Sequence, residues 1–170
     1  ATFSKFTPPA NTGLGFLDAV ADNTILSLAD EHDADGDGIS GRVNWITLPQ
    51  YITYRPGTVD HNNKYIGRFG KKAAVYDLMQ QTANAYNQDM GIVSTYEPYD
   101  SYTHAEIDAE VTNQKVLDLV FYLRTLKAPV QRNQTNADVI SGKQLFISIG
   151  CGKCHVPELK TGDYSIAALA

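Results

Sequence analysis

The stretch GKQLFISIGCGKCH, residues 142 to 155, places both cysteines of the protein beside one of its four histidines. The residues before the cysteines favour a helix, because Asn136 can cap it and apolar side chains recur along one side as far as Ile149. Gly142 interrupts that helix at a cost of about 1 kcal/mol relative to alanine, which a close crossing by another helix would explain. The sequence therefore predicts a helix that runs directly into a C-x-x-C-H motif.

The motif has the spacing of a covalent haem site. If residues 151 to 155 form a helical turn, Cys151, Cys154 and His155 stand at i, i+3 and i+4 and face one way. Two thiols on one face can add to the two vinyl groups of a haem, and the adjacent imidazole can reach the iron. The pattern thus predicts a c-type haem on Cys151 and Cys154, with His155 as an axial ligand.

Three other interpretations of the motif are open. A redox dithiol is disfavoured because such a C-x-x-C usually opens a helix after a strand, whereas here a helix precedes it. A structural zinc site needs a fourth ligand, for which His32, His61 or His104 would have to approach Cys151 and Cys154. The plainest alternative is an unreactive disulfide at the surface.

The rest of the chain predicts a mainly helical fold. Apolar residues at helical spacing indicate helices over 71–86 and 113–129, the second stopped by Pro129, and shorter ones over 14–21 and after a cap at Asn23. Between residues 43 and 69 the segments VNWIT, QYITY and KYIGRF favour short strands or a small, irregular β-hairpin.

A polar connector, QRNQTN, separates two predicted parts of the chain. Residues 1–134 would form a helical domain with an acidic loop and the small hairpin. Residues 135–170 would form the start of a haem domain that the chain does not complete.

The acidic loop DEHDADGDGISG favours a cation site. Asp33, Asp35 and Asp37 alternate with small residues, so their carboxylates can converge on Ca²⁺, and the Ile39 carbonyl can add a further oxygen. The loop departs from an EF-hand, because position twelve counted from Asp33 is Asn44 rather than glutamate. The alternative is a solvated acidic turn without a metal.

Five motifs in order carry a resemblance to a known family: DGDGISGR, IGRFGKKA, QQTANAYNQDMGI, VFYLRTLKAP and GCGKCHVPELKTG. Together they resemble the bacterial di-haem c-type oxidoreductases, described as peroxidases or thiol oxidoreductases and distantly related to di-haem cytochrome c peroxidases. Gly142 and Phe146 also resemble the crossing glycine and packing aromatic in the first helix of a class I cytochrome c. The resemblance implies a cytochrome-c-like helix and haem-attachment segment at the C-terminal end.

The resemblance further implies a periplasmic or extracellular redox protein with two c-haems that relay electrons between a donor and a catalytic iron. This chain has one C-x-x-C-H motif, so its partner would be a redox protein or the remainder of the same polypeptide. For the sixth ligand of the iron, Met90 is the better candidate of two methionines, although either can simply fill the core. Arg68 and Arg124, beside apolar runs, are candidates for pairing with haem propionates.

Charge and hydropathy exclude some functions. The net charge of −5 gives no electrostatic case for nucleic-acid binding. No apolar run reaches the ~18 residues that a membrane span needs. Two further hypotheses remain beside the di-haem oxidoreductase: a haem-free, calcium-stabilised structural or interaction domain, and a simple electron-transfer cytochrome c.

Overall fold

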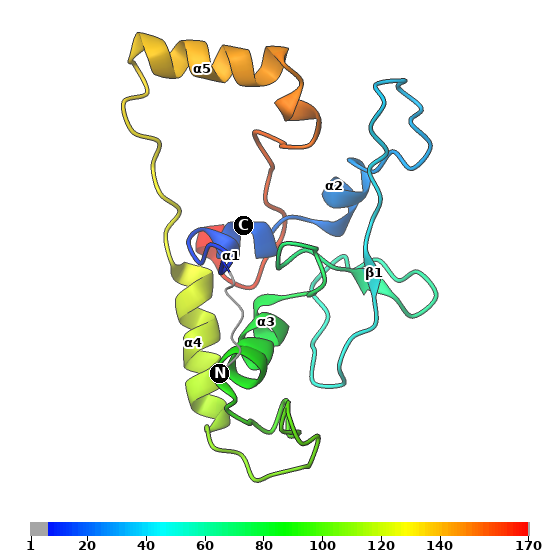
Figure 1. The fold of residues 1–170 in the computed structure, drawn as a ribbon, viewed down its shortest axis with the longest axis vertical. Helices are drawn as coiled ribbons and strands as arrows, with labels where there is room; N and C mark the ends of the chain where they lie inside the picture. Colours follow the sequence, from blue (N-terminus) through cyan, green and yellow to red (C-terminus); the bar gives the residue numbers. More distant parts are fainter. Residues whose placement is uncertain (1–6, 170) are drawn as a thin grey trace, which may run out of the picture.

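The computed structural model describes residues 7–169, and its regular structure is mostly helical (Figure 1). Within that range there are five α-helices: α1 (Leu14–Asp18), α2 (Asp22–Leu26), α3 (Leu78–Asn84), α4 (Asn113–Thr125) and α5 (Ala137–Ser148). A π-helical turn, η1 (Ala85–Asp89), extends α3, and two 3₁₀ turns lie near the end of the chain, η2 (Cys151–Lys153) and η3 (Ala167–Leu169). An antiparallel pair joins β1 (Trp45–Ile46) to β2 (Tyr65–Ile66). The prediction of a mainly helical fold with a small hairpin is confirmed.

The core lies where α1, α3 and α4 meet. Its central side chains are Phe69, Leu78, Met79, Val111, Val116 and Val120. Leu14 and Leu17 of α1 and Leu123 of α4 pack around this centre. Burial of one such aliphatic side chain contributes about 1.5–3 kcal/mol, so this cluster contributes substantially to the stability of the fold.

The helix predicted over residues 71–86 begins late, at Leu78. The Asp77 side chain caps it, because its carboxylate accepts the Gln80 N–H at 2.8 Å. The preceding residues form a tight turn instead, in which Ala73 has a φ of 47° and Phe69 bridges to Val75. The apolar spacing correctly predicted a helix here, but the predicted start of that helix at residue 71 is wrong.

The helix predicted over residues 113–129 also ends early. Thr112 caps α4 through the Lys115 N–H at 3.4 Å, but the helix stops at Thr125 rather than at Pro129. Leu126 is extended, and its carbonyl accepts the Gly13 N–H at 3.0 Å. The chain therefore leaves the helix to bond with the start of α1.

A close approach of two helices occurs at Gly15, not at Gly142. A Cβ atom on Gly15 would lie 1.8 Å from the Arg124 carbonyl oxygen, so α1 can pack on α4 only without a side chain there. A Cβ on Gly142 would meet nothing within 4 Å in the described part of the chain. The predicted crossing at Gly142 is therefore wrong for this structure.

Two smaller predictions also differ. The segment QYITY forms no strand; in the described part of the chain the two paired strands are Trp45–Ile46 and Tyr65–Ile66. Asn23 lies inside α2, whose N-cap is Ala21, because the preceding Asp22 already takes the first helical position. None of the helices in residues 7–169 has the length and apolar character that crossing a bilayer requires.

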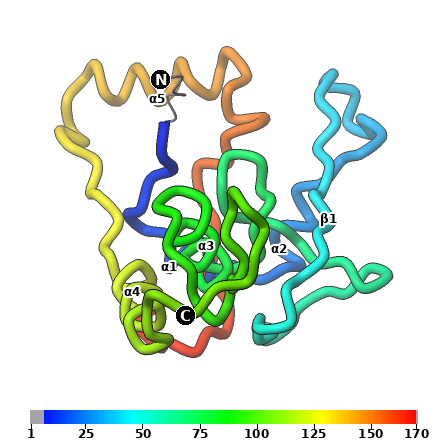
Figure 2. The backbone as a smooth tube through the Cα atoms, turned by 60° about the horizontal axis from the view of Figure 1, so that its bottom comes forward, coloured from blue at the N-terminus to red at the C-terminus, as the bar shows by residue number. Residues whose placement is uncertain are grey.

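Helix α5, in the predicted second part of the chain, stands apart from the core. Figures 1 and 2 show α5 set off from the other helices and joined to them by long extended segments on both sides. No residue of α5 is buried. The apolar side chains of α5 therefore face solvent, and the predicted division into two domains stays a prediction.

Candidate haem-attachment site

The C-x-x-C-H motif forms the helical turn that its spacing predicts. Asn136 caps α5, accepting the Asp138 N–H at 2.7 Å, and Gly150 ends the helix with a φ of 88°. The His155 N–H then donates to the Cys151 carbonyl at 2.9 Å, which closes one α-type turn across the motif. Residues 151, 154 and 155 therefore have the helical spacing on which covalent haem attachment depends.

Both thiols of the motif are free and reachable. Cys151 is half-buried, Cys154 is exposed, and no disulfide joins them. In residues 7–169 the one group of carboxylate, thiol and imidazole side chains with metal-binding geometry lies elsewhere, in the acidic loop. His61 stacks on Trp45 with ring centroids 4.8 Å apart. Among residues 7–169, therefore, no further carboxylate, thiol or imidazole completes a zinc site at the motif, whereas the accessible thiols and the exposed His155 suit a haem.

Helix α5 helps to position the imidazole. The Phe146 ring lies 5.9 Å from the His155 ring, centroid to centroid, at an angle of 58°. Such a tilted aromatic contact is worth about 0.5–1.5 kcal/mol beyond its buried area. Phe146 is therefore a packing partner of the predicted axial ligand.

Lys153, inside the motif, reaches the acidic loop 116 residues earlier. Its ammonium lies 3.3 Å from the Asp37 carboxylate and donates to the Asp37 carbonyl at 3.2 Å. The Lys153 side chain is 44% exposed, so the ion pair is weak, at about 0.2–1 kcal/mol. The pair is a contact between the motif and the acidic loop.

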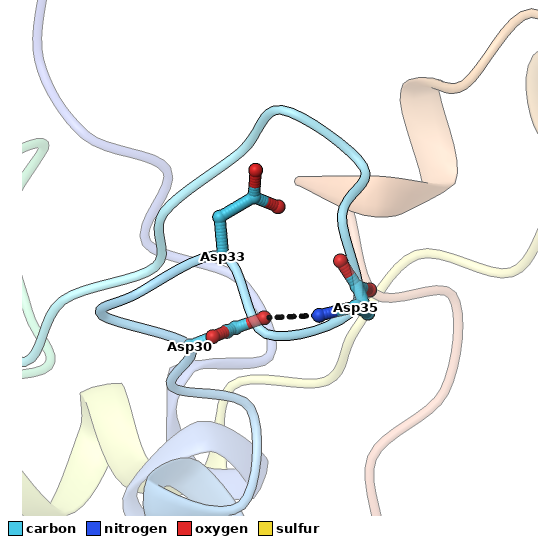
Figure 3. Close-up of side chains that lie close together, drawn as sticks. All are labelled: Asp30, Asp33 and Asp35. Carbon is cyan, nitrogen blue, oxygen red and sulfur yellow. Dashed lines mark hydrogen bonds between the residues drawn. The ribbon is translucent and has the colours of Figure 1, made fainter.

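The acidic loop gathers three carboxylates, of which two were predicted. One oxygen from each of Asp30, Asp33 and Asp35 lies within 4.8 Å of the others. Figure 3 shows the three side chains on one loop, with the Asp35 N–H directed at the Asp30 carboxylate at 3.3 Å. The Ala34 N–H also donates to Asp30, at 2.9 Å, and holds the pKa of that carboxyl below its ordinary value.

Asp37 lies apart from the three grouped carboxylates, and the Ile39 carbonyl stays a predicted ligand. Asp37 lies outside the group of three and is engaged with Lys153. The Ile39 N–H donates to the Asp37 carboxylate at 2.8 Å, which forms a local turn. The sequence missed Asp30 because it lies outside the alternating pattern, three residues before Asp33.

Met90 is not beside the motif. It follows η1 and is 54% exposed. The segment around η1 and the segment around η2 lie well apart in Figures 1 and 2. Its role as sixth ligand stays a prediction, and the structure brings no support to it.

The two arginines considered for haem propionates are paired with carboxylates. Arg68 binds Asp22, and both side chains are buried, at 2% and 0% exposed. Arg68 also donates to the Val20 carbonyl at 2.6 Å. Burial, aided by the charge of Arg55, lowers the pKa of Arg68 to about 10. This pair is part of the fold of the helical domain and is not available to a propionate.

A second buried carboxylate, Asp18, joins segments from both ends of the chain. It accepts from Arg124 Nε at 3.2 Å, lies 3.7 Å from Arg55, and accepts the Tyr164 hydroxyl. Burial and the charge of Asp18 raise the pKa of Tyr164. No sequence signal pointed to this network, because Asp18 and Tyr164 are 146 residues apart.

A mainly helical fold that presents a C-x-x-C-H turn is typical of c-type haem proteins. The chain belongs to the di-haem oxidoreductase family: a sequence profile of that family, described as "di-haem oxidoreductase, putative peroxidase", matches residues 6–170. Neither the curated proteins nor the solved structures contain a significant match. Membership agrees with the resemblance carried by the five motifs, and it supports a haem redox role.

Proposed function

We propose that the chain carries one c-type haem, linked by thioethers to Cys151 and Cys154, with His155 as the proximal ligand. The observation that carries the proposal is the helical turn at the end of α5, with both thiols free and the imidazole exposed beside them. The surrounding segment would then act as a cytochrome-c-like haem segment, as the resemblance implies.

Each residue of the motif has a defined task. Every thiol adds its sulfur and its hydrogen across one vinyl double bond, so attachment needs no external oxidant. His155 offers an imidazole nitrogen to the iron, and the Phe146 ring restricts the orientation of that imidazole. The bound haem supplies one-electron chemistry, and the protein tunes it through the axial ligand and the polarity around it.

In this proposal the protein relays electrons in the periplasm or outside the cell. The electrons come from a donor protein and go to a second haem, located in the remainder of the polypeptide or in a partner. Reduction of peroxide to water consumes two electrons and two protons per molecule, which a relay of this kind can supply. A simple electron-transfer cytochrome c is the alternative.

Expression in a host that matures c-type haems tests the attachment. We expect a Soret band and a covalent mass gain of one haem in the wild-type chain, and neither in the variant Cys151→Ser/Cys154→Ser. His155→Ala should keep the mass gain but change the spectrum of the reduced protein, because only the axial ligand is lost. A colourless wild-type protein of unchanged mass would end the proposal.

Peroxide turnover separates the two redox roles. The full-length gene product, supplied with a reduced donor and hydrogen peroxide, should oxidise the donor if it is a peroxidase. Oxidation by an electron acceptor alone, without peroxide consumption, would favour a simple electron-transfer cytochrome.

A second proposal concerns the acidic loop, since three carboxylates converge there. Asp30, Asp33 and Asp35 would bind Ca²⁺, with the Ile39 carbonyl as a further oxygen. Thermal unfolding of the protein should then occur at a higher temperature with Ca²⁺ than with a chelator. Asp33→Asn should abolish that difference and Glu31→Gln, an exposed change in the same loop, should not. If the protein carries no haem but unfolds at a higher temperature with Ca²⁺ than with a chelator, the result would support the hypothesis of a haem-free, calcium-stabilised structural domain.

A further inference from the structure

The chain after the motif folds back onto α1. The Gly162 N–H donates to the Ala19 carbonyl at 2.8 Å, and Thr161 forms an antiparallel bridge with Val20. In Figure 1 the segment that descends from η2 runs alongside α1 towards the end of the chain. These contacts, together with the buried network around Asp18, hold the region directly after the motif against the helical domain.

A groove of about 670 Å³ lies between α1 and this segment. The residues that line it are Phe16, Leu17, Val20, Val156, Leu159, Lys160 and Thr161. Several apolar side chains that face it remain open to solvent: Phe16 is 43% exposed, Val156 41% and Leu159 37%. Cofactor sites typically have volumes of about 300–1,000 Å³ and mostly apolar linings with a few polar groups. The groove has this size and this composition.

We infer that this groove receives the haem carried by Cys151 and Cys154, so that α1 of the helical domain forms one wall of the haem pocket. The inference rests on the proposed function. Val156, which lines the groove, follows His155 directly in the chain, so a macrocycle bound through the thiols and the imidazole would be attached close to the groove.

The chemistry of the lining favours a haem over other occupants. A haem has a broad apolar body and two propionate groups at one edge. The groove offers apolar side chains on both walls and a single cation, Lys160, which can pair with a propionate. A second copy of the chain or a peptide would have to displace a group that is covalently attached beside the groove.

The occupied groove would also join two parts of the fold. The haem would contact α1 on one side and the segment around Val156 and Leu159 on the other. Since it would bind this arrangement only in the folded state, it should stabilise the contact between them.

Methyl NMR of the reduced, haem-bearing chain tests the placement directly. Methyl groups next to the face of a porphyrin are shifted by its ring current. Leu17 and Val20 methyl signals should therefore shift relative to the haem-free variant Cys151→Ser/Cys154→Ser. Leu117 and Val130, exposed residues that do not line the groove, should keep their positions.

A matched pair of variants gives a second readout. Phe16→Ser opens one wall of the groove, whereas Phe121→Ser changes another exposed phenylalanine, on α4, that does not line it. Greater access of water to the haem should lower its reduction potential in Phe16→Ser, and Phe121→Ser should leave the potential unchanged. Circular dichroism establishes that both variants fold.

The outcomes separate the inference from the proposed function. A wild-type chain without covalent haem removes the proposed function and the inference with it. A haem-bearing chain with unshifted Leu17 and Val20 methyls, or with equal potentials in the two phenylalanine variants, overturns the inference alone.

Discussion

Two helices of similar length, α4 with 13 residues and α5 with 12, have very different surroundings. Val116 and Val120 of α4 are buried in the core, whereas Leu145 and Ile147 of α5 are 57% and 50% exposed. An isolated helix of this length is marginal in water, so its stability comes from packing. Helix α4 therefore gains its stability from packing on α1 and α3, whereas α5 buries no residue in the described part of the chain.

The largest difference in stability should appear between the buried ion pair near α2 and the exposed ion pair at the C-x-x-C-H motif. Asp22→Ala leaves the buried Arg68 without its partner and should cost about 3–5 kcal/mol. Asp37→Ala breaks the exposed pair with Lys153 and should cost about 0.2–1 kcal/mol. Urea unfolding of both variants measures the two values, and similar losses would contradict the comparison.

The next effect concerns two leucines. Leu78→Ala, at a fully buried position of α3, should destabilise the protein by about 2–5 kcal/mol. Leu145→Ala on α5 should change stability by no more than about 0.5 kcal/mol in the haem-free chain. Thermal melts of both variants, with and without haem, would sharpen the contrast, since a haem that covers α5 would make the second change costly.

Two glycines should respond in opposite directions. Gly15→Ala forces α1 away from the Arg124 carbonyl and should cost about 1–3 kcal/mol. Gly142→Ala meets no neighbour and should add about 0.5–1 kcal/mol through helix propensity. Chemical denaturation of the haem-free protein gives both values. A loss at Gly142 would mean that another helix does cross there.

The smallest effect depends on pH and concerns the cap of α3. Burial raises the pKa of Asp77 above its ordinary value of 3.8, so the folded state favours the protonated acid. Its contribution to stability therefore falls as the pH rises through 3.8, and at neutral pH ionisation is a cost. Asp77→Asn keeps an oxygen for the Gln80 N–H and should be more stable than wild type at neutral pH.

The measurement for Asp77→Asn is the free energy of unfolding from pH 3 to pH 7. Its advantage over wild type should shrink as the pH falls towards 3.8. Asp77→Ala, which removes the charge and the cap together, should lose about 1 kcal/mol for the missing cap. A pH-independent difference between wild type and Asp77→Asn would show that the carboxylate is not penalised by its surroundings.

Local features of the fold were predictable from the sequence, because they depend on neighbours in the chain. The turn across Cys151 and His155, the cap at Asn136 and the middle of α4 follow from spacing and capping alone. The two carboxylates Asp33 and Asp35 were also found, since a short glycine-rich loop brings them together without help from the rest of the fold.

Features that join distant segments were not predictable. The glycine at the contact between α1 and α4 is Gly15, which depends on where α4 packs, whereas the sequence analysis predicted a helix crossing at Gly142. Nothing in the residues around Asp18 or Tyr164 shows that they meet. The groove beside the motif was missed for the same reason, since its two walls come from opposite ends of the chain.

The two bonds at the ends of α1 have a mechanical consequence. Gly13 binds Leu126 at one end of this short helix, and Ala19 binds Gly162 at the other. Residues 127–161 thus form a closed loop, and both ends of this loop are hydrogen-bonded to α1, a few residues apart. After protease cleavage in the polar connector, the motif would stay attached to α1 through Gly162. A longer connector would alter the entropy of closing this loop only slightly.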